Sequence, residues 1–246
     1  MLRRNIPDLL TLGNLACGVL GIAFCVQGNP VLATWMILLS ALLDFFDGMA
    51  ARALGINNPH GKDLDSLADV VSFGVLPGFL AYSLIAPDSA VWEGKLWLLG
   101  IETKAGLERL ALLALVVPAV FSAYRLAKFN HDTRQTENFI GLPTPAHALF
   151  WVGLIQGIDQ GIWYLVASPI IVFILIVLFS LLLLAPLPMF SLKLKQKGWK
   201  GNELRYSFLL GCLPVLLWLQ IAGLALIMVV YLMVSMLSAA GSKPKA

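Results

Sequence analysis

The chain has 246 residues, of which 59% are apolar and only 13% are charged, and its mean hydropathy is +0.84. Soluble domains carry about 25% charged residues, so this composition excludes an ordinary soluble globule and indicates several apolar segments that cross a bilayer. The net charge of +3 is small, and the three cysteines lie in apolar stretches without a CxxC pair, which supports neither a disulfide framework nor a thiolate metal site.

The apolar runs predict an all-α fold, a polytopic membrane helix bundle with about eight transmembrane helices. In chain order the expected helices are 8–28, 31–53, 66–87, 105–128, 144–161, 165–189, 206–221 and 223–240. The apolar region 204–237 is too long for one span, and we expect it to fold back between Gln220 and Gly223. Residues 1–190 then form a six-helix membrane core, and residues 191–246 form a basic cytoplasmic loop and a C-terminal transmembrane hairpin.

The basic residues predict the orientation of this bundle. With an even number of spans, 14 of the 17 Lys and Arg residues fall on one side of the membrane, and only Lys95, Lys104 and Arg109 fall on the other. Basic residues are enriched in cytoplasmic loops, so we expect both termini in the cytoplasm. The basic run 193–205 is expected to contact anionic lipid, and nucleic acid is not an expected partner.

Four carboxylates lie at the junction of the second and third expected helices. Asp44 and Asp47 are three residues apart, and Asp65 and Asp69 are four apart, so each pair occupies one face of its helix. The loop 54–62 turns the two helices antiparallel, which brings the pairs together at the cytoplasmic end.

Four carboxylates at one depth in an apolar protein repel each other and need counter-charge. The nearby sequence supplies only Arg52 and Lys62. Aspartate oxygens suit Mg²⁺ or Mn²⁺, and a pair of such ions could hold a diphosphate and stabilise a leaving oxygen. The small residues Gly48 and Ala51 leave a bare helix face for a base or ribose, and Arg52 offers a fork for phosphate.

This region resembles the CDP-alcohol phosphotransferase family. The family pattern D-x2-D-G-x2-A-R-x8-G-x3-D-x3-D is matched at every position, by Asp44, Asp47, Gly48, Ala51, Arg52, Gly61, Asp65 and Asp69. The resemblance implies that the core 1–190 is the phosphotransferase unit and that the four aspartates hold two divalent cations, Mg²⁺ or Mn²⁺. It implies that Gly48, Ala51, Arg52 and Gly61 contact the nucleotide and its phosphates, and that Asp69 is the base that activates the acceptor hydroxyl. It also suggests a homodimer in the bacterial inner membrane, with the site facing the cytoplasm.

Within the family the chain is similar to the members that transfer a phosphatidyl group from CDP-diacylglycerol to L-serine, with release of CMP. The similarity rests on residues 6–18, 71–77, 124–130 and 139–145. Asp8 departs from the usual Asn, and His147 falls in a run that is usually made of small residues. The carboxylate of serine needs a cationic partner, for which Arg125 is the best candidate because it lies within an apolar pattern, although it could instead be a solvated cytoplasmic anchor. Asn130 is a weaker candidate.

Two alternatives remain open at this point. Glycerol 3-phosphate or an inositol phosphate could replace serine as the acceptor, because anionic acceptors would also suit the basic residues. A cation transporter could also use membrane carboxylates, but transporter sites favour broken helices near the midplane in repeated halves, and this motif is not repeated.

Overall fold

The computed structural model describes residues 5–56, 59–86, 104–131, 139–190 and 202–241. The expectations for Arg3, Arg4, the loop 88–103, Arg134, the basic run 193–200, Lys243 and Lys245 lie outside these residues. The helices are α1 (Ile6–Val26), α2 (Pro30–Ala53), α3 (Pro59–Asp69), α4 (Leu76–Ile85), α5 (Lys104–His131), α6 (Thr144–Asp159), α7 (Pro169–Leu184), α8 (Glu203–Leu219) and α9 (Gly223–Gly241).

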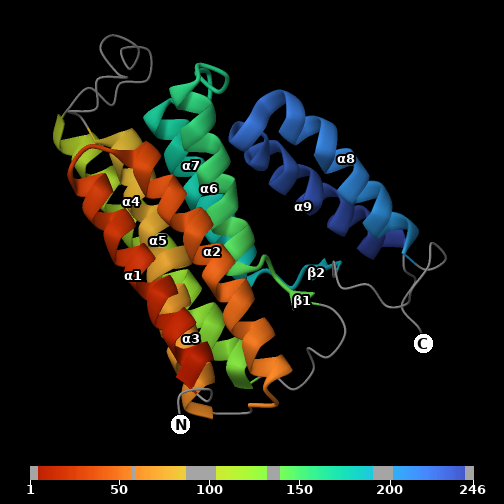
Figure 1. The fold of residues 1–246 in the computed structure, drawn as a ribbon. Coiled ribbons are helices and arrows are strands. Elements are labelled where there is room, and N and C mark those ends of the chain that lie inside the picture. The colour runs from red at the N-terminus through yellow and green to blue at the C-terminus, as the bar shows by residue number, and fades with distance from the viewer. Residues whose placement is uncertain (1–4, 57–58, 87–103, 132–138, 191–201, 242–246) are drawn as a thin grey trace.

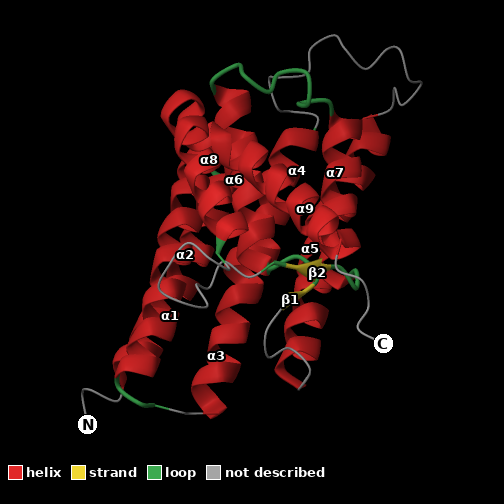
Figure 2. Cartoon of the chain, turned by 90° about the vertical axis from the view of Figure 1, so that its right-hand side faces the viewer, coloured by secondary structure: helices red, strands yellow, loops and turns green. Residues whose placement is uncertain are grey.

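The helices form one bundle in which α1 packs along α2, α5 packs against α4 and α7, and α6 lies between α2 and α9 (Figures 1 and 2). A two-stranded antiparallel pairing of β1 (Phe139–Ile140) with β2 (Pro188–Met189) is an addition to the expected all-α fold. It joins the segment before α6 to the segment after α7. The fold is therefore the predicted helix bundle with one small sheet at its side.

The third helical segment begins earlier than expected, at Pro59 rather than at residue 66. Its first residues, including His60, Gly61, Lys62 and Asp63, are mostly polar, so hydropathy placed the boundary too late, whereas proline suits a first helical turn. The segment continues through a π-helix, η2 (Val70–Val75), into α4. Asp65 and Asp69 consequently lie inside this helix and do not open it.

The sixth expected helix ends earlier than predicted, whereas the predicted fold-back of the C-terminal region is present. α7 ends at Leu184 and not at residue 189, because Ala185 precedes Pro186 and a residue before proline disfavours the helical conformation. The fold-back of the C-terminal region is confirmed: α8 ends before the 3₁₀ turn η5 (Gln220–Ala222), and Gln220 has a positive φ of 50°. The two helices pack side by side as a hairpin (Figure 1).

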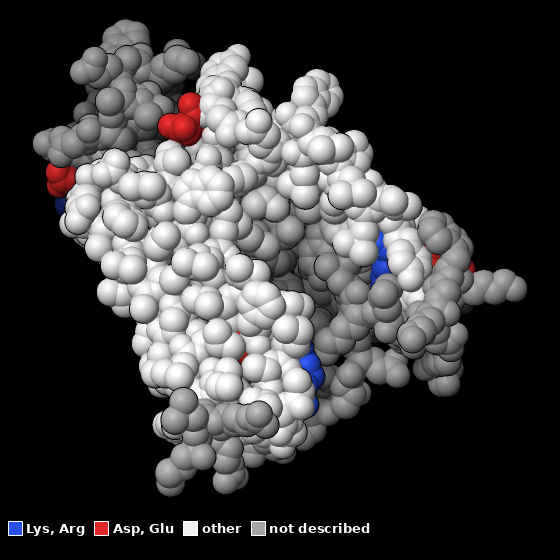
Figure 3. Space-filling model, viewed as in Figure 1, with Lys and Arg blue, Asp and Glu red and all other residues white. Residues whose placement is uncertain are grey.

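The described residues contain five helical stretches long and apolar enough to cross a membrane. These are Ile6–Val26, Pro30–Ala53, Pro59–Ile85, Gly106–Asn130 and Glu203–Ser238, the last of which includes both arms of the hairpin. The face shown in Figure 3 carries almost no charged side chains over the middle of the helices, as a lipid-facing surface requires. The chain is thus a membrane helix bundle, while the count of eight spans stays a prediction.

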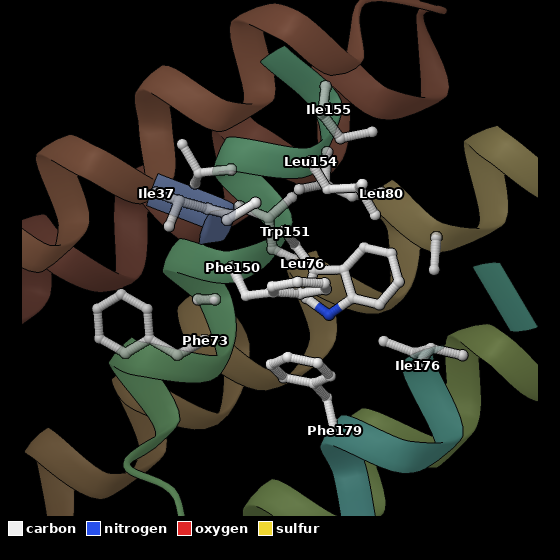
Figure 4. Packing of buried hydrophobic residues seen from close by; sticks show 14 of the residues in the cluster. Ile37, Phe73, Leu76, Leu80, Phe150, Trp151, Leu154, Ile155, Ile176 and Phe179 are labelled. Carbon is white, nitrogen blue, oxygen red and sulfur yellow. The ribbon is translucent and has the colours of Figure 1, made fainter. Parts of the chain in front are cut away.

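The core is centred on α6 (Figure 4). Trp151 is fully buried, and the ring of Phe150 stacks on Phe179 of α7 with centroids 3.8 Å apart. Gln156 donates a hydrogen bond of 2.6 Å to the Thr34 hydroxyl on α2. Apolar packing and this buried polar contact therefore help to fix α6 between the helices on either side.

The contact between α6 and α9 predicts one stability effect. A Cβ at Gly153 would overlap the backbone of Ala225, whereas a Cβ at Gly211 on α8 would meet nothing within 4 Å. We expect Gly153→Ala to lower the melting temperature in detergent by several degrees, because forced overpacking costs about 1–3 kcal/mol. The matched Gly211→Ala should leave it unchanged or raise it, since alanine favours helices. Equal melting temperatures for the two variants would contradict the close contact.

Candidate active site

The structure brings the two aspartate pairs together. Asp44 and Asp47 lie on α2, and Asp65 and Asp69 lie on α3, which packs beside α1 at the same end of the bundle (Figure 2). Asp47 and Asp69 are buried, with 6% and 7% of their surface exposed, and Asp44 and Asp65 are half-buried. The predicted convergence of the four carboxylates is therefore present.

Three of the four carboxylates form a tighter group. One oxygen from each of Asp44, Asp47 and Asp65 lies within 4.8 Å of the other two. The carboxyl groups of Asp44 and Asp65 are within hydrogen-bonding distance of each other, a contact that two ionised groups cannot hold without a proton or a cation between them.

These three residues fit a divalent cation. Among the described residues, the Asp65 Oδ1 atom is buried without a hydrogen-bond partner, although a carboxylate oxygen removed from water needs one. The donor set consists only of carboxylate oxygens, which hard cations such as Mg²⁺ and Mn²⁺ prefer. Asp44, Asp47 and Asp65 would hold the ion, and Asp69 does not belong to this three-residue group.

A cavity of about 280 Å³ opens beside the group. Its lining residues come from the start of α1, the end of α2 and the start of α3: Pro7, Asp8, Thr11, Asp47, Gly48, Ala51, Ile56, Gly61, Lys62 and Asp65. Three of the four residues predicted to contact the nucleotide, namely Gly48, Ala51 and Gly61, thus share one cavity with two of the predicted metal ligands. Asp8, the departure from the family pattern, also lines it.

Arg52, the fourth predicted contact, is exposed and lies over Gly48. Its Nη1 atom is 3.4 Å from the point that a Cβ on Gly48 would occupy. The guanidinium is therefore at the edge of the cavity, where it is free to contact phosphate.

Helix α1 contributes two residues that the sequence analysis did not assign to the site. The Thr11 hydroxyl donates to Asp47 Oδ2 over 2.7 Å, and the Asn14 side-chain amide donates to Asp69 Oδ1 over 3.3 Å. Both side chains are buried. Their spacing of three residues on an otherwise apolar helix could have predicted that they share one face of α1. In the structure that face is turned toward α2 and α3.

Arg125 on α5 is buried, with 8% of its surface exposed, and is not a solvated surface residue. Its guanidinium interacts electrostatically with Asp69 and with Tyr231 of α9, and its central carbon lies 5.7 Å from the centre of the Phe129 ring. Within the described part of the chain, its Nε atom has no hydrogen-bond partner. A buried guanidinium with an unused donor beside Asp69 is suited to an anionic group on a substrate.

Asn130 lies at the end of the same helix and contacts α3. Its side-chain amide donates to the Ser66 hydroxyl over 2.8 Å, and its backbone carbonyl accepts from Lys62 Nζ over 3.0 Å. These bonds tie α5 to the segment that carries Asp65 and Asp69.

The model of the CDP-alcohol phosphatidyltransferase family matches residues 4–237. The chain belongs to this family. The matched residues include the four aspartates of α2 and α3 as well as most of the C-terminal hairpin.

Three named relatives show which members of the family the chain is similar to. The chain is 36% identical over 140 residues to the CDP-diacylglycerol–serine O-phosphatidyltransferase of Bacillus subtilis, covering 57% of this chain and 69% of that protein. It is 33% identical over 148 residues to the enzyme of the same name from Helicobacter pylori, covering 59% and 55% of the two chains. It is also 34% identical over 148 residues to the archaetidylserine synthase of Methanothermobacter thermautotrophicus, covering 58% and 54%. The aligned region thus spans little more than half of the last two relatives.

The three-carboxylate group predicts cation binding that is independent of activity. Asp65→Asn removes one ligand charge, and we expect Mn²⁺ affinity, measured by electron paramagnetic resonance on the purified protein, to fall at least about tenfold. Asp63→Asn is the matched control, because Asp63 is exposed and two residues away, and it should bind Mn²⁺ as the wild type does. An equal loss in both variants would show that general surface charge, and not this group, holds the ion.

Proposed function

We propose that the chain transfers the phosphatidyl group of CDP-diacylglycerol to L-serine, giving phosphatidylserine and CMP. The observation that carries the proposal is the arrangement of three converging carboxylates, a separate buried Asp69 and an adjacent cavity within one phosphotransferase family fold. The relatives that are 33–36% identical to it over 140–148 aligned residues carry names that refer to serine or to a serine lipid.

At phosphorus the reaction makes one P–O bond and breaks another. Asp69 takes the proton of the serine hydroxyl, and the serine oxygen forms a bond to the lipid-side phosphorus of the diphosphate. The bond between that phosphorus and the oxygen bridging to CMP breaks, and CMP leaves with the electron pair. Asp69 suits the role of base because it lies outside the three-carboxylate group and, among the described residues, accepts a side-chain hydrogen bond at Oδ1 alone, from Asn14.

Two divalent cations, Mg²⁺ or Mn²⁺, are part of the proposal, held by Asp44, Asp47 and Asp65 together with Asp69. When bound, they would offset the charge of the diphosphate and of the leaving phosphate oxygen. The protein itself binds the nucleotide along Gly48, Ala51 and Gly61, and Arg52 contacts a phosphate from the rim of the cavity.

We assign the serine carboxylate to Arg125. Its position beside Asp69 would place the carboxylate of serine on the guanidinium while the hydroxyl faces the base. Asn130 would support the acceptor site from the end of α5, where its hydrogen bonds hold Lys62 and Ser66 near that site.

The proposal also includes the setting of the enzyme. The distribution of basic residues supports a site at the cytoplasmic face of a bacterial inner membrane, with both termini on that side. The lipid tails then stay in the bilayer while serine arrives from water. The division into a core 1–190 and a C-terminal hairpin, and the homodimer implied by the family resemblance, belong to the same proposal.

The function is tested by incubating the purified protein with CDP-diacylglycerol, Mn²⁺ or Mg²⁺, and one acceptor at a time while CMP release is followed. We expect CMP release with serine and its loss, by at least about a hundredfold, in Asp69→Asn, since removing a general base costs about 10²–10⁴ in rate. Asp63→Asn, with the same change at an exposed position, should retain activity.

Glycerol 3-phosphate and an inositol phosphate are the alternative acceptors in the same assay. CMP release with one of these and not with serine would keep the chemistry and overturn the serine assignment. The absence of CMP with every acceptor would return the cation transporter to consideration.

The role of Arg125 is tested by steady-state kinetics. Arg125→Ala should raise the KM for serine about 10- to 100-fold, the cost of a lost charge-assisted hydrogen bond, with little change in the KM for CDP-diacylglycerol. The KM for serine of Arg125→Lys should lie between that of the wild type and that of Arg125→Ala, because lysine keeps the charge but loses the planar fork. Lys128→Ala, an exposed charge removed from the same helix, is the matched control and should behave as the wild type.

A further inference from the structure

A series of buried hydrogen bonds reaches the proposed base from α2 through α1. Asn14, on α1, is fully buried and donates to Asp69 Oδ1 over 3.3 Å. Ser40, on α2 and also fully buried, donates to the Asn14 side-chain oxygen Oδ1. Three helices therefore meet in the series Ser40, Asn14, Asp69.

The chemistry of the three groups fixes the direction of these bonds. An ionised carboxylate only accepts hydrogen bonds, so Asn14 must turn its NH₂ group toward Asp69 and its oxygen away from it. The oxygen then needs a donor, and the Ser40 hydroxyl supplies one. Ser40 thereby selects the one amide orientation that is useful to Asp69.

The backbone carbonyl of Asn14 does not need the hydroxyl proton of Ser40, because Ser72 also donates to that carbonyl. The Ser40 hydroxyl also lies 3.0 Å from the backbone carbonyl of Asn14, but the Ser72 hydroxyl donates to that same carbonyl over 3.0 Å. The carbonyl therefore has a donor other than Ser40, and the single hydroxyl proton of Ser40 remains available to the Asn14 side-chain oxygen. Ser72 is fully buried as well, so both serines act on Asn14 away from water.

The packing of α1 holds this series in place. A Cβ on Gly18 would lie 2.5 Å from Ser72 Oγ, so glycine at this position lets α1 approach the π-helix that follows Asp69. Only at this separation do the short side chains of Asn14 and Ser72 span the gap between the helices.

We propose that Ser40 and Asn14 are positioning residues that orient the Asp69 carboxylate, with one oxygen held by the Asn14 amide and the other presented to the acceptor hydroxyl. The proposal rests on the function proposed above, in which Asp69 removes the acceptor proton. Ser40 acts only through Asn14 and touches no substrate. Asp44, Asp47 and Asp65 lie outside this series, and the cation that they would hold does not depend on it.

The test compares Ser40→Ala with Ser72→Ala, since each deletes one buried hydroxyl that donates to Asn14. Ser40→Ala should lower kcat roughly three- to tenfold, the net worth of one hydrogen bond, and leave KM for both substrates unchanged. Ser72→Ala should lower kcat less than Ser40→Ala, because it leaves the Ser40 hydroxyl in place and only lets the freed backbone carbonyl compete for its proton. Ser40→Thr, which keeps the hydroxyl, should recover most of the lost kcat.

A double-mutant cycle tests whether Ser40 acts through Asn14. Asn14→Ala should lower kcat at least as far as Ser40→Ala, and adding Ser40→Ala to Asn14→Ala should produce no further loss. Independent, multiplying losses would overturn the series, because they would mean that Ser40 affects the reaction by another route.

Two measurements without turnover separate positioning from folding. Mn²⁺ affinity by electron paramagnetic resonance and melting temperature in detergent should match the wild type in Ser40→Ala. A fall in either that parallels the fall in kcat, an equal fall in Ser72→Ala, or unchanged kcat in Ser40→Ala would each overturn the proposal.

The wild-type reaction distinguishes failure here from failure of the proposed function. CMP release by the wild type with unchanged kcat in the variants overturns only the positioning role. CMP release with a different acceptor moves the same comparison to that acceptor, where the same outcomes decide it. A wild type that releases no CMP removes the role of Asp69 as base, and the positioning role falls with it.

Discussion

Mutual repulsion among four carboxylates inside apolar helices is the constraint on which the site depends. Ionised groups this close and this far from bulk water stay together only when other groups hold them. Helix α1 supplies part of this support, because Thr11 donates a hydrogen bond to Asp47 and Asn14 donates one to Asp69. Arg125 on α5 adds a positive charge that interacts with Asp69. The close approach of α1 to the π-helix follows from the same need.

The four aspartates do not share one environment. Asp44, Asp47 and Asp65 each bring an oxygen within 4.8 Å of the other two, whereas Asp69 lies outside this group, accepts a hydrogen bond from Asn14 and interacts electrostatically with the guanidinium of Arg125. One residue type can therefore serve as cation ligand and as base, because position and partners differ. The π-helix directly after Asp69 is consistent with this division, since such insertions in membrane and soluble helices occur frequently at functional sites.

The membrane bundle, the hairpin at Gln220 and the convergence of the aspartates were predictable because hydropathy and helical periodicity report on them directly. The early start at Pro59 was not, because a polar first turn hides a helix from hydropathy. Thr11 and Ser40 were also missed: an isolated hydroxyl residue in an apolar helix bonds its own backbone as readily as a distant side chain, and only the packing of the helices reveals which. For Arg125 the apolar neighbours favoured an acceptor contact but left a solvated position open, and the packing of α5 shows that the side chain is buried.

Helix α6 carries a consequence for how the protein enters the membrane. It has 16 residues and buries His147 and Gln156, whose partners are the Phe73 carbonyl in the π-helix and Thr34 on α2. Surrounded by lipid alone, these polar groups would be unsatisfied. Both partners precede α6 in the chain, so helices made before α6 already carry the groups that its polar side chains need, whereas α9, which contacts Gly153, is made after it.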